Sequence, residues 1–389
     1  MDSLTVLIEK LRGVADDIVG AMNSRIETLA YNFQVNGGLA AVKDYFVYIV
    51  GNIENTVKKP IAQGGLGYSE SEWNGLKSVL VEGLAYASTL MQQTNSTITD
   101  ANKSVLKNNL DLVYLPQLNF SAITNAEGLF QGDYNLMTLP EVVLPSSITS
   151  IKNIFNGCRM LRNSEKFLVE GSGLLNMDGA MLNAKFESDP VRFLCGGKTV
   201  EYNGKTYYDY SRATSMSQTF ATMYYTGKTI GNIYAPNCTN CSSMLASSSA
   251  YEYMEELGDV YIPLCTNANR MLAFQGWIKV GKITVAINCD LTFVINVSTL
   301  EDFAGISGAT KSLDLSNSLS LTPQSVKNVL QTLVDDLTER QGASTAVQAN
   351  SPVLTFKQAV WNAWLASDIY DANLKSDLES AGWTINTVA

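Results

Sequence analysis

An octet of residues recurs along this chain, and this repetition constrains the fold more than any other feature. One copy is Cys238-Thr-Asn-Cys-Ser-Ser-Met-Leu245. The other copies begin at Ile123, Ile148, Leu174, Ala213, Cys265 and, in a weaker form, Val297. The successive starts lie 25, 26, 39, 25, 27 and 32 residues apart. A period of about 20 to 50 residues indicates an array of stacked structural units.

The composition of the octet predicts a short helical turn. Positions one, four, seven and eight are mostly apolar or small, which places them on one stripe of a helix. Positions two and three are mostly Thr, Ser or Asn, whose side chains cap a helix start by accepting hydrogen bonds from free backbone N–H groups.

A second pattern, apolar-x-x-apolar-x-apolar, follows the octet and predicts a short strand. Its alternating part has the period of two expected for a strand with one buried face. The full pattern is Leu139-x-x-Val142-x-Leu144, and it returns at Ile230, Leu257 and Val280. Its last half is found in Phe167-x-Val169, Phe193-x-Cys195 and Leu313-x-Leu315. Neither the turn nor the strand can bury its apolar face alone, so we expect neighbouring repeats to stack into one core.

The same pattern predicts which side chains face outward on these strands. One outward column is more apolar than solvent alone would favour, and it consists of Val143, Leu168, Tyr234, Tyr261 and Thr284. Because contiguous exposed apolar surface tends to mark a contact site, we take this column as a candidate partner-binding surface. The alternative is that N-terminal helices or a neighbouring subunit cover it.

The octet and the strand pattern together resemble the leucine-rich repeat family over residues 113–320, in particular its BspA-type repeats with a Thr-Asn/Ser-apolar turn. Similar proteins are encoded by gut Bacteroidota and their phages, and the ending Gly382-Trp383-Thr384-Ile385 is similar to their C-terminal caps. The resemblance implies a recognition scaffold and no catalysis. The expected fold class is α+β: a leucine-rich-repeat-like solenoid of short helix/strand units, with an all-helical N-terminal region and an α/β C-terminal cap.

The N-terminal region differs in kind from the repeats. Residues 3–34 are predicted to form one helix whose apolar residues lie three or four positions apart, and its candidate oligomerisation residues are Leu4, Leu7, Leu11, Val14, Ile18, Met22, Ile26 and Leu29. This spacing fits a coiled coil or an ordinary amphipathic helix packed on its own domain. We assign residues 1–35 to this helix and 36–112 to a helical attachment region. No export signal or membrane span is visible in the sequence.

An insertion at residues 196–212 lengthens the third spacing. It contains Asn203-Gly204, a strong signal for a two-residue type I′ hairpin turn. Tyrosines suit partner contact because they supply large area at little rotamer entropy, although tyrosine is also common in strands. The candidate partner-binding residues of the hairpin are Tyr202, Tyr207, Tyr208 and Tyr210.

Residues 321–389 are predicted to close the repeat array. A helix begins at Leu321-Thr-Pro, with proline in its first turn. A polar loop follows from Ser344 to Pro352, then a strand and helix from Leu354, and finally a helix–strand pair from Leu374.

Composition excludes several classes of function. The 389-residue chain has no histidine and a net charge of −10, which removes the commonest general base and opposes binding to nucleic acid. The pair Cys238-x-x-Cys241 has zinc-like spacing, but both cysteines occupy apolar octet positions, so we expect them to be buried. We expect no cofactor and no metal. The outward carboxylates Asp259 and Asp314 are better explained by a solvated strand face than by an acid pair.

These observations lead to three hypotheses. The first is a non-enzymatic virion protein, a bacteriophage fibre or spike subunit that binds other virion proteins through its N-terminal helices and a host-surface glycan or protein through its repeats. We expect it to be a homo-oligomer, with a trimer favoured. The second is a bacterial leucine-rich-repeat adhesion protein at the cell surface. The third and most remote is a carboxylate-based glycan-acting enzyme.

Overall fold

The computed structural model describes residues 97–109, 112, 115 and 118–389, with gaps at 137, 162, 165, 187–188, 226, 248–253 and 274–275, and also residues 58, 67 and 69–72. The chain divides into two compact units, Met1–Gln92 and Gln93–Ala389. The predicted N-terminal helix, with its candidate oligomerisation residues Leu4 to Leu29, lies outside the described residues.

The described part of the first unit includes a capped helix start at residues 69–72. Residues 70–72 are helical. The Ser69 hydroxyl accepts a hydrogen bond from the Glu72 N–H at 3.3 Å, and the Glu72 carboxylate accepts one from the Ser69 N–H at 2.8 Å. This reciprocal pair is a capping box.

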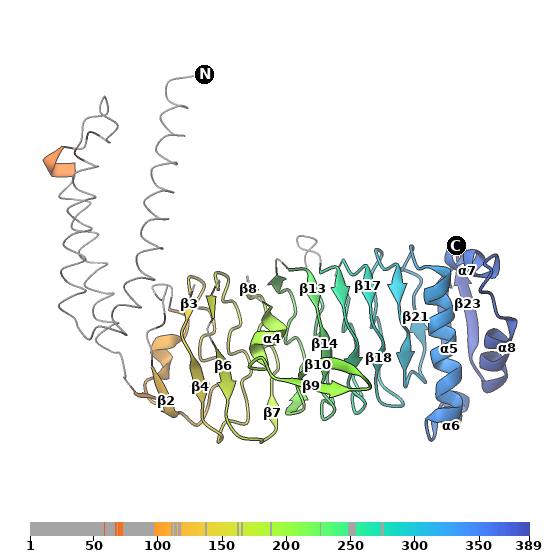
Figure 1. Ribbon diagram of the computed structural model, residues 1–389, viewed down its shortest axis with the longest axis horizontal. Coiled ribbons are helices and arrows are strands. Elements are labelled where there is room, and N and C mark those ends of the chain that lie inside the picture. Colours follow the sequence, from red (N-terminus) through yellow and green to blue (C-terminus); the bar gives the residue numbers. More distant parts are fainter. Residues whose placement is uncertain are drawn as a thin grey trace. The chain divides into compact units, whose positions relative to one another are not determined.

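The second unit is a mixed α+β structure in which short parallel strands of successive repeats lie side by side (Figure 1). In the middle repeats, each repeat contributes two strands that one or two residues separate. The first strands form a four-stranded sheet of β13 (Thr229–Ile230), β15 (Glu256–Leu257), β17 (Lys279–Val280) and β19 (Asp302–Phe303). The second strands belong to a six-stranded sheet and are β14 (Asn232–Tyr234), β16 (Val260–Tyr261), β18 (Ile283–Thr284) and β20 (Ile306–Ser307).

The earlier repeats pair in the same parallel manner but in two-stranded sheets. These pairs are β1 (Thr97–Thr99) with β2 (Asn119–Ala122), β3 (Thr138–Leu139) with β5 (Asn163–Ser164), β4 (Val142–Leu144) with β6 (Phe167–Val169), β7 (Leu175–Asn176) with β11 (Ala213–Ser215), and β8 (Lys185–Phe186) with β12 (Tyr224–Tyr225). The apolar positions of the strand pattern are buried as predicted: Leu139, Val142 and Leu144 are each at most 1% exposed.

The octet forms hydrogen-bonded turns and not the predicted helical turn. Alternate backbone N–H groups point to the next repeat: those of Cys241, Ser243 and Leu245 donate to the carbonyls of residues 267, 269 and 271, each at 2.8 Å. A helix would direct these groups to carbonyls four residues earlier in the same repeat. The predicted helical turn was wrong because the spacing of apolar residues indicates which side chains are buried. It does not indicate to which carbonyls the backbone N–H groups donate.

The sixth residue of each octet adopts a left-handed conformation, which also ends any helix. The φ angles lie between 53° and 61° at Gly128, Asn153, Gly179, Gln218, Ser243 and Arg270. The apolar octet positions nevertheless face the core, and Cys238, Cys241, Met244 and Leu245 are at most 1% exposed. The expected burial of the octet cysteines is therefore confirmed.

The last octet lies earlier than the sequence pattern suggested. A parallel bridge pairs Asn267 with Asp290, and Phe293 adopts the left-handed conformation of a sixth position. The segment predicted as the weak seventh copy, residues 297–304, instead contains β19. Phe303 and Ile306 continue the strand pattern there, and both are buried.

A helix replaces the strand predicted at Phe193-x-Cys195. Helix α4 spans Pro190–Leu194, and the Asp189 carboxylate caps it by accepting hydrogen bonds from the N–H groups of Val191 and Arg192. Asp at the N-cap followed by Pro is a strong local start signal, and it overrides the weak alternation that follows. As a result β6 is separated from the six-stranded sheet.

The repeat unit begins earlier than the assigned boundary at residue 113. Strand β1 pairs with β2, and the 3-10 helix η2 (Lys103–Leu106) follows β1. Residues 97–106 therefore belong to the second unit and not to the helical attachment region.

The C-terminal part forms an α/β end, as expected. Helix α5 (Pro323–Glu339) begins at Thr322, whose hydroxyl accepts a hydrogen bond from the Ser325 N–H at 3.2 Å. A parallel sheet follows the order β21-β22-β23, and the remaining elements are β21 (Leu313–Asp314), α6 (Ala343–Asn350), β22 (Val353–Lys357), α7 (Gln358–Leu365), α8 (Ala372–Ala381) and β23 (Thr384–Val388). The predicted polar loop at 344–352 is mostly helix α6.

Two further features belong to this end. Trp361 and Trp364 are buried with ring centroids 4.8 Å apart. Asp336 of α5 accepts hydrogen bonds from the Ser307 hydroxyl at 2.7 Å and from the Gly308 N–H, which ties α5 to the last repeat. Within the part of the chain that the structure describes, no helix has the length and hydropathy needed to cross a membrane.

Candidate functional site: the tyrosine face

The predicted outward column is present, but it is divided between two sheets. Tyr234, Tyr261 and Thr284 are in register on β14, β16 and β18. Val143 and Leu168 are in register on β4 and β6, in a separate two-stranded sheet. Helix α4 lies between β6 and the larger sheet in the sequence. The five residues are all half-buried, and they do not form one continuous column.

The inserted hairpin is part of the six-stranded sheet. Its strands β9 (Thr199–Tyr202) and β10 (Lys205–Asp209) pair in antiparallel fashion around Asn203 and Gly204, whose φ angles of 49° and 72° confirm the predicted I′-type turn. Strand β10 also pairs in parallel with β14. The hairpin extends across the neighbouring strands toward β18 (Figure 1).

Four tyrosine rings meet where the hairpin crosses the sheet, and we call Tyr202, Tyr207, Tyr234 and Tyr261 the tyrosine face. Tyr234 and Tyr261 are stacked with centroids 5.2 Å apart and an interplanar angle of 6°. Tyr202 lies 5.2 Å from Tyr234 and 4.4 Å from Tyr261. Tyr207 lies 6.2 Å from Tyr234. The outward column is thus covered in part by the chain's own hairpin, a possibility that the sequence did not suggest.

Asp259 fixes the tip of the hairpin on the sheet. Its carboxylate accepts hydrogen bonds from Lys205 Nζ at 2.7 Å and from the Tyr207 hydroxyl at 3.1 Å, while the Lys282 N–H donates to its other oxygen at 2.9 Å. Asn232 Nδ2 donates to the Thr206 carbonyl at 2.8 Å. Burial opposes ionisation of Asp259, but the hydrogen bonds from Lys205, the Lys282 N–H and Tyr207, together with the charge of Lys205, outweigh it and keep the pKa of this carboxyl below its usual value.

The surroundings of the tyrosine face raise the pKa values of two of its hydroxyl groups. Burial, followed by a hydrogen bond with Tyr202, raises the pKa of Tyr261 to about 12. Burial and the negative charge of Asp259 raise the pKa of Tyr207 above its usual value. These phenols therefore remain neutral near pH 7 and act as hydrogen-bond donors with apolar rings.

The hairpin tyrosines do not all face solvent. Tyr207 and Tyr210 are 4% and 1% exposed, and the Tyr210 hydroxyl donates to the Val191 carbonyl. Tyr208 donates to the Asp189 carboxylate at 2.6 Å. The prediction that Tyr210 contacts a partner was wrong, because it is a core residue that anchors α4 to the hairpin. The exposed side chains of the hairpin are Thr199, Glu201, Asn203, Lys205 and Thr206.

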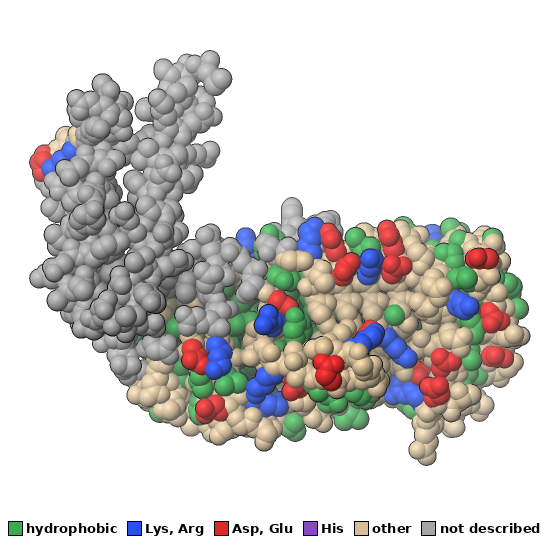
Figure 2. Space-filling view, viewed as in Figure 1, with side chains coloured by type: hydrophobic (Ala, Val, Ile, Leu, Met, Phe, Trp, Pro, Cys, Tyr) green, Lys and Arg blue, Asp and Glu red, His purple; other side chains and the backbone are tan. Residues whose placement is uncertain are grey.

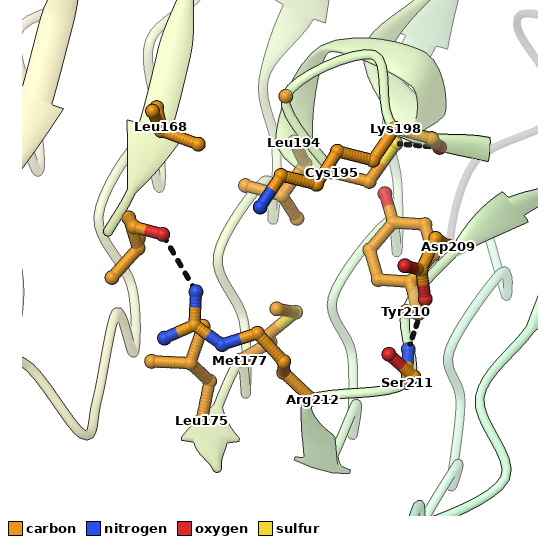
Figure 3. Close-up of a pocket in the computed structure, with 12 residues that line it drawn as sticks. Leu168, Leu175, Met177, Leu194, Cys195, Lys198, Asp209, Tyr210, Ser211 and Arg212 are labelled. Carbon is orange, nitrogen blue, oxygen red and sulfur yellow. Dashed lines mark hydrogen bonds between the residues drawn. The ribbon is translucent and has the colours of Figure 1, made fainter. Parts of the chain in front are cut away.

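A cavity of about 50 Å³ lies beside the base of the hairpin (Figure 3). Arg212 extends along it, and its guanidinium donates to the carbonyls of Val169, Glu170 and Gly173 at 2.6–3.1 Å. Cys195 also lines it, and burial raises the pKa of this thiol to about 11. A cavity of this size suits one or two water molecules, and its thiol is protonated near neutral pH, so it suits neither a substrate nor a nucleophile.

The octet cysteines form a row of buried thiols. The Sγ atoms of Cys238 and Cys241 are 3.3 Å apart, and Cys265 forms hydrogen bonds with Cys241 and Cys289. Hydrogen bonds with neighbouring thiols, together with burial, raise the pKa values of Cys241 and Cys289. Metal ligation requires thiolates, which these surroundings disfavour at Cys241 and Cys289. Within the described ranges, no group of three or more Cys, Asp or Glu side chains is arranged to hold a metal ion.

The two carboxylates considered as an acid pair have separate structural partners. Asp259 binds Lys205 and Tyr207, and Asp314 accepts a hydrogen bond from the Ser316 N–H at 2.9 Å. Sequence reasoning did not find the role of Asp259 or of Lys205, because they lie 54 residues apart and no local pattern joins them.

No protein-family model, curated protein or solved structure matches this chain.

Proposed function

We propose that this chain is a non-enzymatic recognition protein whose repeats form a leucine-rich-repeat-like solenoid that presents the tyrosine face and hairpin to a partner. The observation that carries the proposal is that the hairpin tip is held on the sheet by Lys205–Asp259 and by the Tyr202–Tyr261 contact. A surface that is ordered before binding loses less entropy on association. The parallel pairing of successive repeats supports the solenoid.

The partner is a protein or a glycan on a cell surface. The half-buried rings of Tyr202, Tyr234 and Tyr261 offer area, and the exposed Glu201 and Thr206 offer hydrogen-bonding groups beside it. Among the described residues, charges of both signs are scattered over the viewed face and form no extended basic area (Figure 2). Binding to nucleic acid relies on such an area, so nucleic acid is not the proposed partner.

The proposed biological setting is a bacteriophage virion, in which the chain is a fibre or spike subunit. The N-terminal helices would attach it to other virion proteins, and the subunit would be a homo-oligomer, preferably a trimer. This part of the proposal depends on the resemblance to phage-encoded leucine-rich repeat proteins, which is an analogy at the level of the fold.

Imaging and mass measurement of the purified chain test the setting. Light scattering gives the number of subunits, and negative-stain electron microscopy gives their arrangement. We expect a trimer with a stalk and three outward lobes. A compact monomer would favour the alternative of a bacterial adhesion protein at the cell surface.

Binding to glycan and protein arrays tests the recognition role directly. The control is a chain in which Tyr234 and Tyr261 are replaced by Ser and the fold is verified by circular dichroism. We expect specific signals that this variant loses. Turnover of any glycan on the array by the wild-type chain would support the remote alternative of a carboxylate-based enzyme.

A further inference from the structure

A second hollow, of about 450 Å³, lies near the start of the repeat unit. Its wall is built from η2 and from the first two octets, and it includes Lys103, Lys107, Glu127, Gly128, Gln131 and Lys152. Ligand-binding pockets in proteins usually have volumes of about 300 to 1,000 Å³. This hollow therefore has the size of a small-molecule site, unlike the cavity beside the hairpin.

The acidic side chains of the hollow are already engaged by the protein. Asp100 accepts hydrogen bonds from the Thr124 hydroxyl, from the N–H groups of Thr124 and Asn125, each at 3.1 Å, and from Lys103 Nζ at 3.1 Å. The hydrogen bond from the Thr124 hydroxyl is the main reason that the pKa of Asp100 is lowered to about 2. Glu127 accepts a hydrogen bond from the Ser150 hydroxyl at 2.6 Å.

Two lysines of the hollow remain available to a ligand. Among the described residues, the ammonium groups of Lys107 and Lys152 have no hydrogen-bond or ion-pair partner, and both side chains are exposed. Both residues line the hollow. The Lys152 carbonyl accepts the Gly128 N–H at 2.8 Å, and Lys107 Nζ would lie 3.2 Å from a Cβ added at Gly128. In a chain with a net charge of −10, two free ammonium groups in one hollow make it a candidate site for an anion.

Gly128 lies in the wall of this hollow. It occupies the sixth octet position, where other copies have side chains, namely Asn153, Gln218, Ser243 and Arg270. Gly179 also lacks a side chain, but there the Asn153 Oδ1 atom lies 2.3 Å from the place of a Cβ and fills the space. At Gly128 a Cβ would lie 2.9 Å from Gln131 Oε1 and 3.2 Å from Lys107 Nζ. The polar ends of these two side chains therefore lie where a side chain of residue 128 would begin, and they remain exposed to the hollow because the residue is glycine.

We propose that this hollow binds an acidic saccharide, with the sugar carboxylate between Lys107 and Lys152. Charge-assisted hydrogen bonds from ammonium groups are the strong ones in such a site. The side chains of Gln131, Asn125 and Asn153 supply amide groups for sugar hydroxyls. The lining residues include no aromatic side chain, so the site favours a hydroxyl-rich ligand over an apolar one. The proposal stands on residues other than those of the tyrosine face and does not depend on it.

Direct binding measurements on the full chain test this proposal. The probes are a disaccharide that contains glucuronic acid, its neutral glucose counterpart and inorganic phosphate, each titrated by nuclear magnetic resonance or calorimetry. We expect the acidic disaccharide to bind about tenfold or more tightly than the neutral one. We also expect its affinity to fall as salt is added, because exposed charges are screened.

Two variants locate the site. In Lys107→Ala/Lys152→Ala the affinity for the acidic disaccharide should fall about tenfold or more. In Gly128→Asn both lysines remain, but the added side chain would displace the ends of Gln131 and Lys107, and Asn tolerates the left-handed conformation, so binding should also weaken. The control Lys282→Ala/Lys327→Ala removes the same charge elsewhere and should bind like the wild type.

Three results would overturn the proposal. One is equal binding of the acidic and neutral disaccharides, or no binding of either. Another is full affinity in the folded Lys107→Ala/Lys152→Ala or Gly128→Asn variant. The third is binding of inorganic phosphate at least as tight as that of the acidic disaccharide, which would identify a simple anion site.

Discussion

The ring of Tyr202, at the end of the first hairpin strand, lies 4.4 Å from the ring of Tyr261 on β16, and the two phenols share a hydrogen bond. Strand β14, with Tyr234, separates β10 from β16 in the sheet. A residue of the inserted hairpin is therefore packed on a strand of a different repeat. This contact, together with Lys205–Asp259, sets where the exposed side chains of the hairpin are displayed.

We expect Tyr202→Ala to release the hairpin from the sheet. The substitution removes ring contacts with Tyr207, Tyr234 and Tyr261, and aromatic pairs contribute about 0.5 to 1.5 kcal/mol each beyond area burial. Hydrogen exchange of residues 199–206 should become faster while the rest of the repeat unit is unchanged. Tyr224→Ala, at a half-buried tyrosine that packs on Lys185, is the control. Unchanged exchange in the Tyr202 variant would show that the ring contacts of Tyr202 do not hold the hairpin.

The variant Tyr234→Ser/Tyr261→Ser should weaken partner binding, both directly and by loosening the hairpin, and leave the core of the repeats intact. Both side chains lie on the outward face of their strands, and the inward residues Ile233, Val260 and Ile262 form the core. The measurement is binding to the partner found on the arrays, with the fold checked by circular dichroism. Full retention of binding in the folded variant would move the contact site away from this face.

The variant Cys238→Ala/Cys241→Ala should lower the free energy of unfolding by about 1 to a few kcal/mol, because removal of buried side chains leaves a cavity. Both thiols are completely buried. Denaturant unfolding measures the effect, with Cys195→Ala, at a half-buried cysteine, as the control. Stoichiometric zinc in the purified wild-type chain would contradict the structural role.

Asp133 should make the stability of the protein depend on pH. Its side chain is completely buried, one carboxylate oxygen accepts the Asn109 N–H at 2.8 Å, and the other has no hydrogen-bond partner among the described residues. Burial raises the pKa of this carboxyl from 3.8 to about 7. Between these two pKa values, the Asp133 carboxyl is therefore protonated in the folded chain and ionised in the unfolded chain.

The sign of the effect follows from this raised pKa. The contribution of Asp133 to the free energy of unfolding is fully present below about pH 4. It decreases as the pH rises and is lost above about pH 7. Its total size is about 4 kcal/mol at most, from about 1.4 kcal/mol per unit of pKa shift. Denaturant unfolding between pH 4 and 8 should show this decrease in the wild type and a smaller one in Asp133→Asn. If the free energy of unfolding depended on pH in the same way in both proteins, Asp133 would not be the group responsible.

Removal of residues 1–92 should give a monomeric repeat unit if the N-terminal region joins the subunits. The boundary lies before β1, because β1 pairs with β2 and a cut at residue 110 would remove a strand of the second unit. Size-exclusion chromatography with light scattering compares the two chains. If the shortened chain keeps the full oligomer size, the subunit contact lies within the repeats or the C-terminal end.

Local patterns in the sequence predicted much of the second unit. Alternating apolar residues identified the buried positions of the strands, because removal of apolar surface from water depends little on the detailed backbone path. The Asn203-Gly204 turn and the Thr322-Pro323 helix start were also predictable, since both depend on neighbouring residues alone. The Asp189-Pro190 signal of α4 was equally local but was overlooked in favour of a two-residue alternation.

The remaining features depend on partners that lie one or more repeats away. Alternate octet N–H groups donate to the next repeat, the hairpin lies across β14 (Figure 1), and Lys107 lies near Gly128 only after the first repeats stack. The tertiary structure decided these features because a sequence pattern records the burial of a side chain but not the identity of a distant hydrogen-bond or charge partner.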